Sequence, residues 1–361
     1  LRFLYLDADP LFMKRIGDIQ DEGYWTHNAR MKVLFDNWVP DEMSHAIIFS
    51  PLYSGLMYLS FKILGISFFS ARFLSALFSS FTLFLLYFLL RSTLKKEIAV
   101  LGTLILSLNY TYLIYNRTAL VETTLSFFLF LSLSCWYYSY KRPWLSSISG
   151  LSFSIAILTK ITAIYFLPIF IFLWIIDYYH NRFKISSFFF FNACTAIPIL
   201  SYAYFVFIPN LPLYKTNLLN SLTFSHNSIW DILTSLLRIF TNNFFGEISV
   251  YILFFLLVLY IITAAMEENS ISSLLNNSPQ IIIISLCWLV GGMIGMVFSN
   301  MHDRRFIMFL IPLSIIASYA IHCWKKDNSL KISTLVEKIS AHLPYSFFLR
   351  LCISILSAYP I

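Results

Sequence analysis

The sequence predicts an all-α protein that crosses a membrane many times, and three observations lead to this fold class. Of the 361 residues 58% are hydrophobic and only 12% are charged, whereas soluble domains carry about twice that share of charge. The mean hydropathy is +0.74. The 37 Phe and 22 Tyr residues suit lipid-facing surfaces and the aromatic belts of membrane interfaces.

Apolar stretches of about 20 residues, the length that spans a bilayer, lie near 70–90, 97–115, 118–140, 185–207, 248–266, 280–299 and 305–323. Another apolar stretch, 145–176, is interrupted by Lys160 and is too long for one ordinary span. Cytoplasmic loops are enriched in Lys and Arg. If the chain turns at Lys160, four short basic loops all face the cytoplasm, namely 91–96, 141–142, 180–184 and 325–331. We therefore predict two helices here, with Lys160 at the external face.

These spans predict one transmembrane domain over 1–361, with about eight or nine transmembrane helices. Within it, 1–68 is a first external loop, 69–323 the transmembrane core, and 324–361 a cytoplasmic segment with the start of a further span. The chain starts at Leu1 rather than Met and stops inside an apolar run, so we expect membrane helices to be missing at the N-terminus and at the C-terminus. The net charge of +7 concerns topology and anionic lipid, since no basic patch with interleaved aromatic residues predicts nucleic-acid binding.

The first external loop carries two predicted amphipathic helices that lie in the plane of the membrane surface. Over 24–38, large apolar residues recur at helical spacing with charged residues between them, which is typical of an interfacial helix. A second such helix spans 49–65, with Pro51 near its start. Asp21 comes just before the first helix, so it can cap that helix and can also act as a general base.

Several charged residues lie within or beside predicted membrane spans, where a charge is costly and usually has a function or a partner. Glu122, about one turn into a span, is either paired with Arg117 or part of a site, since carboxylates at that depth are costly. Lys160 either snorkels to the headgroups or binds a lipid-linked phosphate. Arg304 and Arg305 lie in a short external link against the usual charge bias, which indicates an anion site. We interpret the remaining charged residues near the first loop as solvated or interfacial, namely Glu42, Lys62 and Arg72.

Metal and nucleotide sites find little support in the sequence. His27, His45 and His302 share no metal-ligand spacing, so a divalent metal held by carboxylates and a His stays a minor alternative and no other cofactor is predicted. The chain has no P-loop, GxGxxG motif or serine nucleophile elbow. The five Cys residues form no CxxC pair, and we interpret them as small buried hydrophobic residues.

The charged candidates share one predicted membrane face although they come from distant segments. Carboxylates at Asp21 and Glu122 and cations at Lys160, Arg304 and Arg305 would meet at the level of the lipid headgroups. A carboxylate there can deprotonate an acceptor hydroxyl, and the cations can stabilise a leaving phosphate. This arrangement favours the transfer of a group from a lipid phosphate.

Five motifs in order resemble the GT-C membrane glycosyltransferases, and most of all the protein O-mannosyltransferase and lipid A aminoarabinose transferase superfamily. They are DEGYWTHNARM (21–31), FSPLYSGLMYL with the later ARFLSAL (49–77), NRTALVETTLSFF (116–128), AILTK (156–160) and RRFIMFLIPL (304–313). The resemblance covers roughly residues 15–325 in register. Phe49 and Ser50 depart from the family pattern ahead of Pro-Leu-Tyr, which leaves metal binding and the acceptor open.

The resemblance implies an inverting transfer of a sugar from a polyprenyl-phosphate donor to a lipid, glycan or protein acceptor at the external face. Asp21 matches the family's base, beside Glu22, and Glu122 matches its second acidic position. Lys160 and Arg305 match contacts to the donor phosphate, to which we add Arg304 and Arg117. We assign substrate contacts to His27, His45, Tyr53 and His302. A secondary transporter or flippase of polyprenyl-linked glycans and a non-catalytic membrane scaffold are the alternatives.

Overall fold

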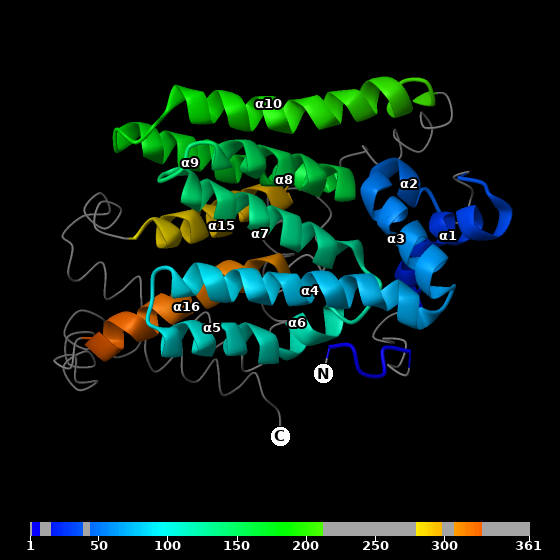
Figure 1. Cartoon of the computed structure of the whole chain (residues 1–361), viewed down its shortest axis with the longest axis horizontal. Helices are drawn as coiled ribbons and strands as arrows, with labels where there is room; N and C mark the ends of the chain where they lie inside the picture. The colour runs from blue at the N-terminus through cyan, green and yellow to red at the C-terminus, as the bar shows by residue number, and fades with distance from the viewer. Residues whose placement is uncertain (1, 8–15, 39–43, 212–278, 298–306, 327–361) are drawn as a thin grey trace, which may run out of the picture.

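In the computed structural model the protein is a bundle of roughly parallel and antiparallel helices with a small group of helices at one end (Figure 1). The structure describes residues 2–7, 16–38, 44–211, 279–297 and 307–326. The long helices are α4 (Phe68–Arg91), α5 (Lys96–Leu108), α7 (Val121–Ser139), α8 (Leu145–Thr159), α9 (Leu167–Tyr179), α10 (Ile185–Tyr202), α15 (Gln280–Val297) and α16 (Ile307–Lys326). The predicted span over 248–266 and the predicted cytoplasmic surface segment lie outside the described residues.

Three helical stretches of the described chain are long and apolar enough to cross a membrane, namely Phe68–Arg91, Ile161–Tyr179 and Ile185–Phe207. The last of these continues from α10 into a short π-helix, Ala203–Phe207. Shorter apolar helices, Leu145–Thr159, Gln280–Gly295 and Ile307–Cys323, pack with them. The all-helical membrane fold that the composition predicts is therefore confirmed.

Helices α1 (Ile16–Phe35), α2 (Ala46–Phe49) and α3 (Pro51–Leu64) lie together at one end of the bundle, drawn in blue in Figure 1. We call this the α1–α3 end. Helix α3 confirms the second predicted amphipathic helix, because Pro51 occupies its first turn and Gly65, with φ of 79°, follows its last residue; Pro and Gly favour these two positions.

The predicted start of the first amphipathic helix is wrong, because the helix begins earlier in the chain. Helix α1 begins at Ile16, so Asp21 lies inside the helix and is not its N-cap. Ile16 and Ile19 extend the apolar spacing by more than a turn upstream of Asp21. Helix α1 ends at Phe35, and Trp38 lies beyond its C-terminus.

The predicted turn at Lys160 is confirmed. Helix α8 ends at Thr159, Lys160 is extended with φ of −155° and ψ of 122°, and a 3₁₀ helix (η1, Ile161–Phe166) leads into α9. The links from α4 to α5, α7 to α8 and α9 to α10 consequently lie at the end of the bundle opposite the α1–α3 end (Figure 1). Charge bias thus predicted the number of helices in this region correctly.

The prediction of a single span over 97–115 is also wrong, because this stretch consists of two helices. Helix α5 ends at Leu108 and α6 (Tyr110–Tyr115) follows after a break at Asn109. The Asn109 side chain accepts a hydrogen bond from the backbone N–H of Tyr112 at 2.8 Å and so caps α6, as Asn commonly does at a helix start. Composition alone does not separate two helices joined by a single polar residue.

Small and polar residues let α7, α8 and α10 approach closely. The Ser132 hydroxyl donates to the Ser149 carbonyl, and the Ser149 hydroxyl donates to the Ser132 carbonyl, both at 2.8 Å. A Cβ added at Gly150 would collide with the backbone carbonyl of Phe191 on α10. Small residues and interhelical hydrogen bonds of this kind replace the hydrophobic effect as the means of packing helices in lipid.

Gly150→Ala should destabilise the bundle by about 1–3 kcal/mol, because the methyl group has to push α10 away. The melting temperature of the detergent-purified protein measures this effect. Gly55→Ala on α3 is the matched control, since nothing lies within 4 Å of its added Cβ and Ala favours a helix more than Gly does. Equal melting temperatures for the two variants would contradict the close contact of α8 with α10.

Candidate active site

A buried ion pair joins two long helices where they reach the α1–α3 end. Glu122 lies in the first turn of α7 and is 0% exposed, and Lys160, which follows α8, is 5% exposed. The Lys160 Nζ donates to Glu122 Oε1 at 2.6 Å. The positive end of the α7 dipole also favours the carboxylate. Residues 38 positions apart in the chain are thereby fixed at one point.

The same ammonium group connects the bundle to α1. The Lys160 Nζ lies 4.7 Å from the centre of the Trp25 ring, within the range of a cation–π interaction. Trp25 also contacts the Tyr53 ring of α3 edge to face, with 6.5 Å between the ring centres. Helices α1 and α3 therefore cover the Glu122–Lys160 pair.

Of the two alternatives for Glu122, the pairing with Arg117 is wrong, because the carboxylate pairs with Lys160. The Arg117 Nη2 donates instead to the backbone carbonyl of Leu4 at 2.6 Å. Residues 116–120 form a turn rather than a helix, so their spacing does not bring the two side chains onto one helical face. The assignment of Arg117 to a donor phosphate stays a prediction.

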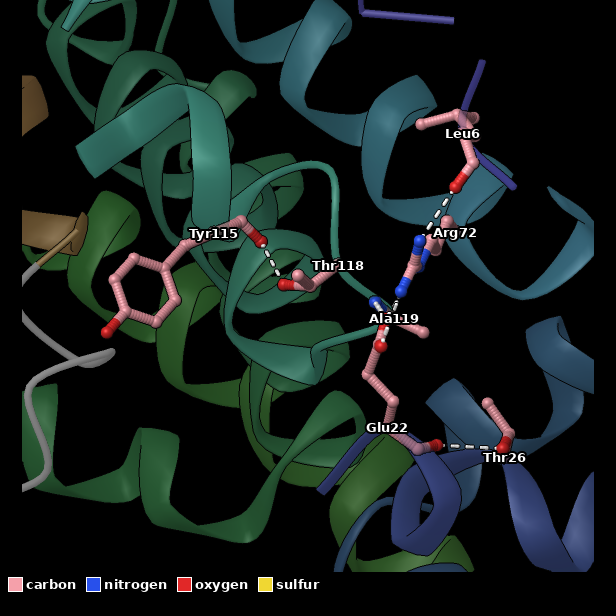
Figure 2. Close-up of polar contacts among 7 residues, drawn as sticks. All are labelled: Leu6, Glu22, Thr26, Arg72, Tyr115, Thr118 and Ala119. Carbon is pink, nitrogen blue, oxygen red and sulfur yellow. Dashed lines mark hydrogen bonds and ion pairs between the residues drawn. The ribbon is translucent and has the colours of Figure 1, made fainter. Parts of the chain in front are cut away.

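Glu22 and Arg72 form a second buried ion pair at the same end (Figure 2). The Arg72 Nε donates to Glu22 Oε1 at 3.0 Å and its Nη2 donates to Oε2 at 2.8 Å. Arg72 is 1% exposed and Glu22 8% exposed, so the expectation that Arg72 is solvated is wrong. An arginine that makes two parallel bonds to a carboxylate holds it in a fixed orientation.

Two backbone contacts extend this ion pair to four segments of the chain. The backbone N–H of Ala119 donates to Glu22 Oε1 at 2.7 Å, and Arg72 Nη1 donates to the Leu6 carbonyl at 2.8 Å. Figure 2 shows Arg72 between Leu6 and the Glu22 carboxylate, with Ala119 beside that carboxylate. In the link that carries Ala119, the Thr118 hydroxyl donates to the Tyr115 carbonyl at 2.8 Å (Figure 2). Both Glu22 oxygens accept bonds from the scaffold, which suits a structural role better than proton transfer.

The backbone of Asp21 lies in α1 next to Glu22, and its side chain lies outside the described residues. Arg304, Arg305 and His302 also lie outside the described residues. Their roles stay predictions.

The other predicted substrate contacts lie at the α1–α3 end. His27 is buried on α1, and its Nδ1 lies 3.3 Å from Arg30 Nη2. His45 immediately precedes α2 and is half-buried, and Tyr53 is fully buried on α3. Within the described ranges, no three His, Cys, Asp or Glu side chains gather as a metal site would need.

Sequence reasoning missed Arg72 and Trp25. The signal for Arg72 was present, because it lies inside the predicted span 70–90 and a charge inside a span needs a partner. The same rule singled out Glu122. For Trp25 the sequence held no such signal, since an aromatic residue at helical spacing on an interfacial helix is ordinary.

Comparisons with known proteins match parts of this chain and its fold. The model of the family described as dolichyl-phosphate-mannose-protein mannosyltransferase matches residues 45–208. A protein of Aquifex aeolicus (strain VF5) described as uncharacterized is 32% identical over 156 residues, which cover 36% of this chain and 31% of that protein. This chain thus spans less than a third of that relative's length.

Two solved structures share the fold. The crystal structure of ArnT from Cupriavidus metallidurans bound to undecaprenyl phosphate matches with a TM-score of 0.60 at 13% identity, covering 85% of this chain and 57% of that one. The apo structure of the same protein matches with a TM-score of 0.59 at 13% identity, covering 85% and 56%. The resemblance to GT-C glycosyltransferases is confirmed, and the chain has the fold of an integral membrane protein.

Proposed function

We propose that the protein is a membrane glycosyltransferase that moves a sugar from a polyprenyl-phosphate donor to a lipid, glycan or protein acceptor. One observation carries the proposal. The buried Glu122–Lys160 pair lies directly beneath α1, the helix that also bears Asp21. Two comparisons support a lipid-phosphate donor: the description of the matching family names dolichyl phosphate mannose, and ArnT binds undecaprenyl phosphate.

In the proposed reaction Asp21 takes the proton from the acceptor hydroxyl. The acceptor oxygen then attacks the anomeric carbon of the donor sugar, the bond from that carbon to the phosphate oxygen breaks, and the electron pair leaves with the lipid phosphate. Attack from the face opposite the phosphate inverts the anomeric centre. Lys160 stabilises the charge of the leaving phosphate, together with Arg117, Arg304 and Arg305.

The two ion pairs have distinct supporting roles in this proposal. Glu122 fixes the position of Lys160, whose ammonium has three N–H donors and can serve a carboxylate and a phosphate oxygen together. Glu22, held by Arg72 and Ala119, anchors α1 and thereby the Asp21 backbone. His27, His45, Tyr53 and His302 would contact the substrates.

A secondary transporter or flippase remains the alternative function. Transporters place substrate and ion sites near the middle of the bilayer in discontinuous helices. Both buried carboxylate–cation pairs of the described chain, Glu22–Arg72 and Glu122–Lys160, lie instead at the α1–α3 end. Their position favours chemistry at a membrane face.

The proposal puts the α1–α3 end at the external face, which cysteine labelling can test. Lys160 itself is buried, so exposed positions have to report the topology. We expect Asp36→Cys, whose native side chain is 92% exposed, to react with a membrane-impermeant maleimide in intact cells. Lys141→Cys, at the exposed link between α7 and α8, should react only after lysis. Both variants require a background without the five native cysteines, and the reverse pattern would place the site in the cytoplasm.

A further inference from the structure

Buried polar atoms without a hydrogen-bond partner gather at the α1–α3 end. Six of them lie there, on α1, on and just before α3, and around the start of α7: Trp25 Nε1, Ser50 Oγ, Tyr53 Oη, Ser54 Oγ, Asn116 Nδ2 and Thr124 Oγ1. Elsewhere in the described part of the chain the comparable atoms are single ones on three different helices: Ser134, Trp174 and Trp288. Each such atom costs about 1–3 kcal/mol if nothing binds it, so a cluster calls for a ligand.

The contacts around Tyr53 place this cluster beside the ion pairs already described. Tyr53 touches Trp25, and Trp25 in turn lies against the Lys160 ammonium. Ser50 and Ser54 flank Tyr53 by less than one helical turn, with the Ser54 N–H bonded to the Ser50 carbonyl at 3.0 Å. On α7, Thr124 follows Glu122 by two residues.

The chemistry of the six atoms selects an uncharged ligand rich in hydroxyl groups. Trp25 Nε1 and Asn116 Nδ2 can only donate, so they require acceptor oxygens and cannot bind an ammonium group. The hydroxyls of Ser50, Ser54 and Thr124 can donate and accept. Burial, with the Glu122 and Glu22 charges nearby, raises the pKa of the Tyr53 hydroxyl, so it keeps its proton and can donate.

The charges around the cluster point the same way. Among the described side chains, the two carboxylates that act on Tyr53, Glu22 and Glu122, are paired with Arg72 and Lys160. A cationic amino sugar would therefore find its nearest described carboxylates already neutralised, and two guanidinium or ammonium groups close by. A neutral sugar, whose hydroxyls both donate and accept, fits this set of partners.

We propose that Trp25, Ser50, Tyr53 and Ser54 form the subsite for the donor sugar, and that this sugar is a neutral hexose rather than an amino sugar. This inference rests on the proposed function, in which Lys160 binds the donor phosphate. The sugar is bonded to that phosphate, so it has to lie next to Lys160, where the cluster is. Since the atoms are buried beneath α1, the contact between Lys160 and Trp25 has to open to admit the lipid-borne sugar.

Binding of three lipids to the detergent-purified full chain tests the inference. The lipids are undecaprenyl phosphate, undecaprenyl phosphate mannose and undecaprenyl phosphate aminoarabinose, titrated by native mass spectrometry. Tyr53→Phe and Ser54→Ala remove one hydroxyl each. We expect each variant to bind the mannosyl lipid about three- to tenfold more weakly, the loss expected for one hydrogen bond. Its affinity for undecaprenyl phosphate should be unchanged. Trp174→Phe, which removes a buried, unpartnered N–H on α9, is the matched control and should change neither affinity.

The outcomes separate this inference from the proposed function. Unchanged affinity of both variants for the mannosyl lipid would mean that the hydroxyls bind water only, and would overturn the subsite. An equal loss of affinity for the mannosyl lipid and for undecaprenyl phosphate would also overturn the subsite, since the substitution would then act by disturbing the fold. Tighter binding of the aminoarabinose lipid than of the mannosyl lipid would overturn the choice of a neutral sugar. Failure of the wild-type protein to bind any of the three lipids would instead refute the proposed donor class.

Discussion

Asp21→Asn should abolish sugar transfer while the protein inserts into the membrane and accumulates normally. The asparagine has nearly the same shape but cannot take a proton, and general base catalysis contributes about 10²–10⁴-fold to such reactions. The measurement is transfer of labelled sugar from undecaprenyl phosphate mannose in membranes that contain equal amounts of each variant.

The helix that carries Asp21 offers a matched control. Asp36 follows α1 directly, is exposed, and pairs only with Lys32 in the described structure. Asp36→Asn makes the same chemical change at the other end of α1 and should leave transfer within about twofold of the wild type, because exposed ion pairs contribute little. Wild-type turnover by Asp21→Asn would remove this residue from the role of base.

Lys160→Met should produce the largest loss of stability, because it leaves the Glu122 carboxylate buried without its cation. Removing one partner of a buried pair costs about 3–5 kcal/mol. The double variant Glu122→Gln/Lys160→Met removes both charges and should recover most of that loss. The melting temperatures of the single and double variants in detergent measure the difference.

Donor binding by the double variant separates the two roles of Lys160. If the ammonium contacts the donor phosphate, the double variant folds but binds undecaprenyl phosphate at least tenfold more weakly, the loss expected for a charged hydrogen bond of about 1.5–3 kcal/mol. Acceptor affinity should change less. Wild-type affinity for undecaprenyl phosphate in a stable double variant would show that the ion pair is purely structural.

The sequence predicted those parts of the fold that depend on local pattern or on charge bias. The turn at Lys160 followed from the distribution of basic loops, and the start of α3 followed from Pro51. The break at Asn109 was missed because one polar residue hardly alters the hydropathy of a 19-residue stretch, 97–115. The predicted start of α1 was too late, because Asp21 is a residue type that commonly caps a helix and was interpreted as the N-cap.

The partners within the site were harder to predict, because they depend on tertiary contacts. Glu22 and Arg72 are 50 positions apart, and Glu122 and Lys160 are 38 apart. Sequence proximity reports only on neighbours within a few turns, so the one partner it offered for Glu122 was Arg117, five residues earlier. The membrane still supplied a usable rule, that each buried charge needs a counter-charge, although it did not say which one.

The four-segment contact around Arg72 sets an order for the assembly of the protein during synthesis. Its donors and acceptors come from Leu6, Glu22, Arg72 and Ala119, so the contact is complete only after residue 119 has left the ribosome. Until then the Glu22 carboxylate lacks the bond from the Ala119 N–H, whereas Leu6 and Glu22, which bind Arg72, have already been made. The link between α6 and α7 should therefore add the last of these bonds, to a carboxylate that Arg72 already holds.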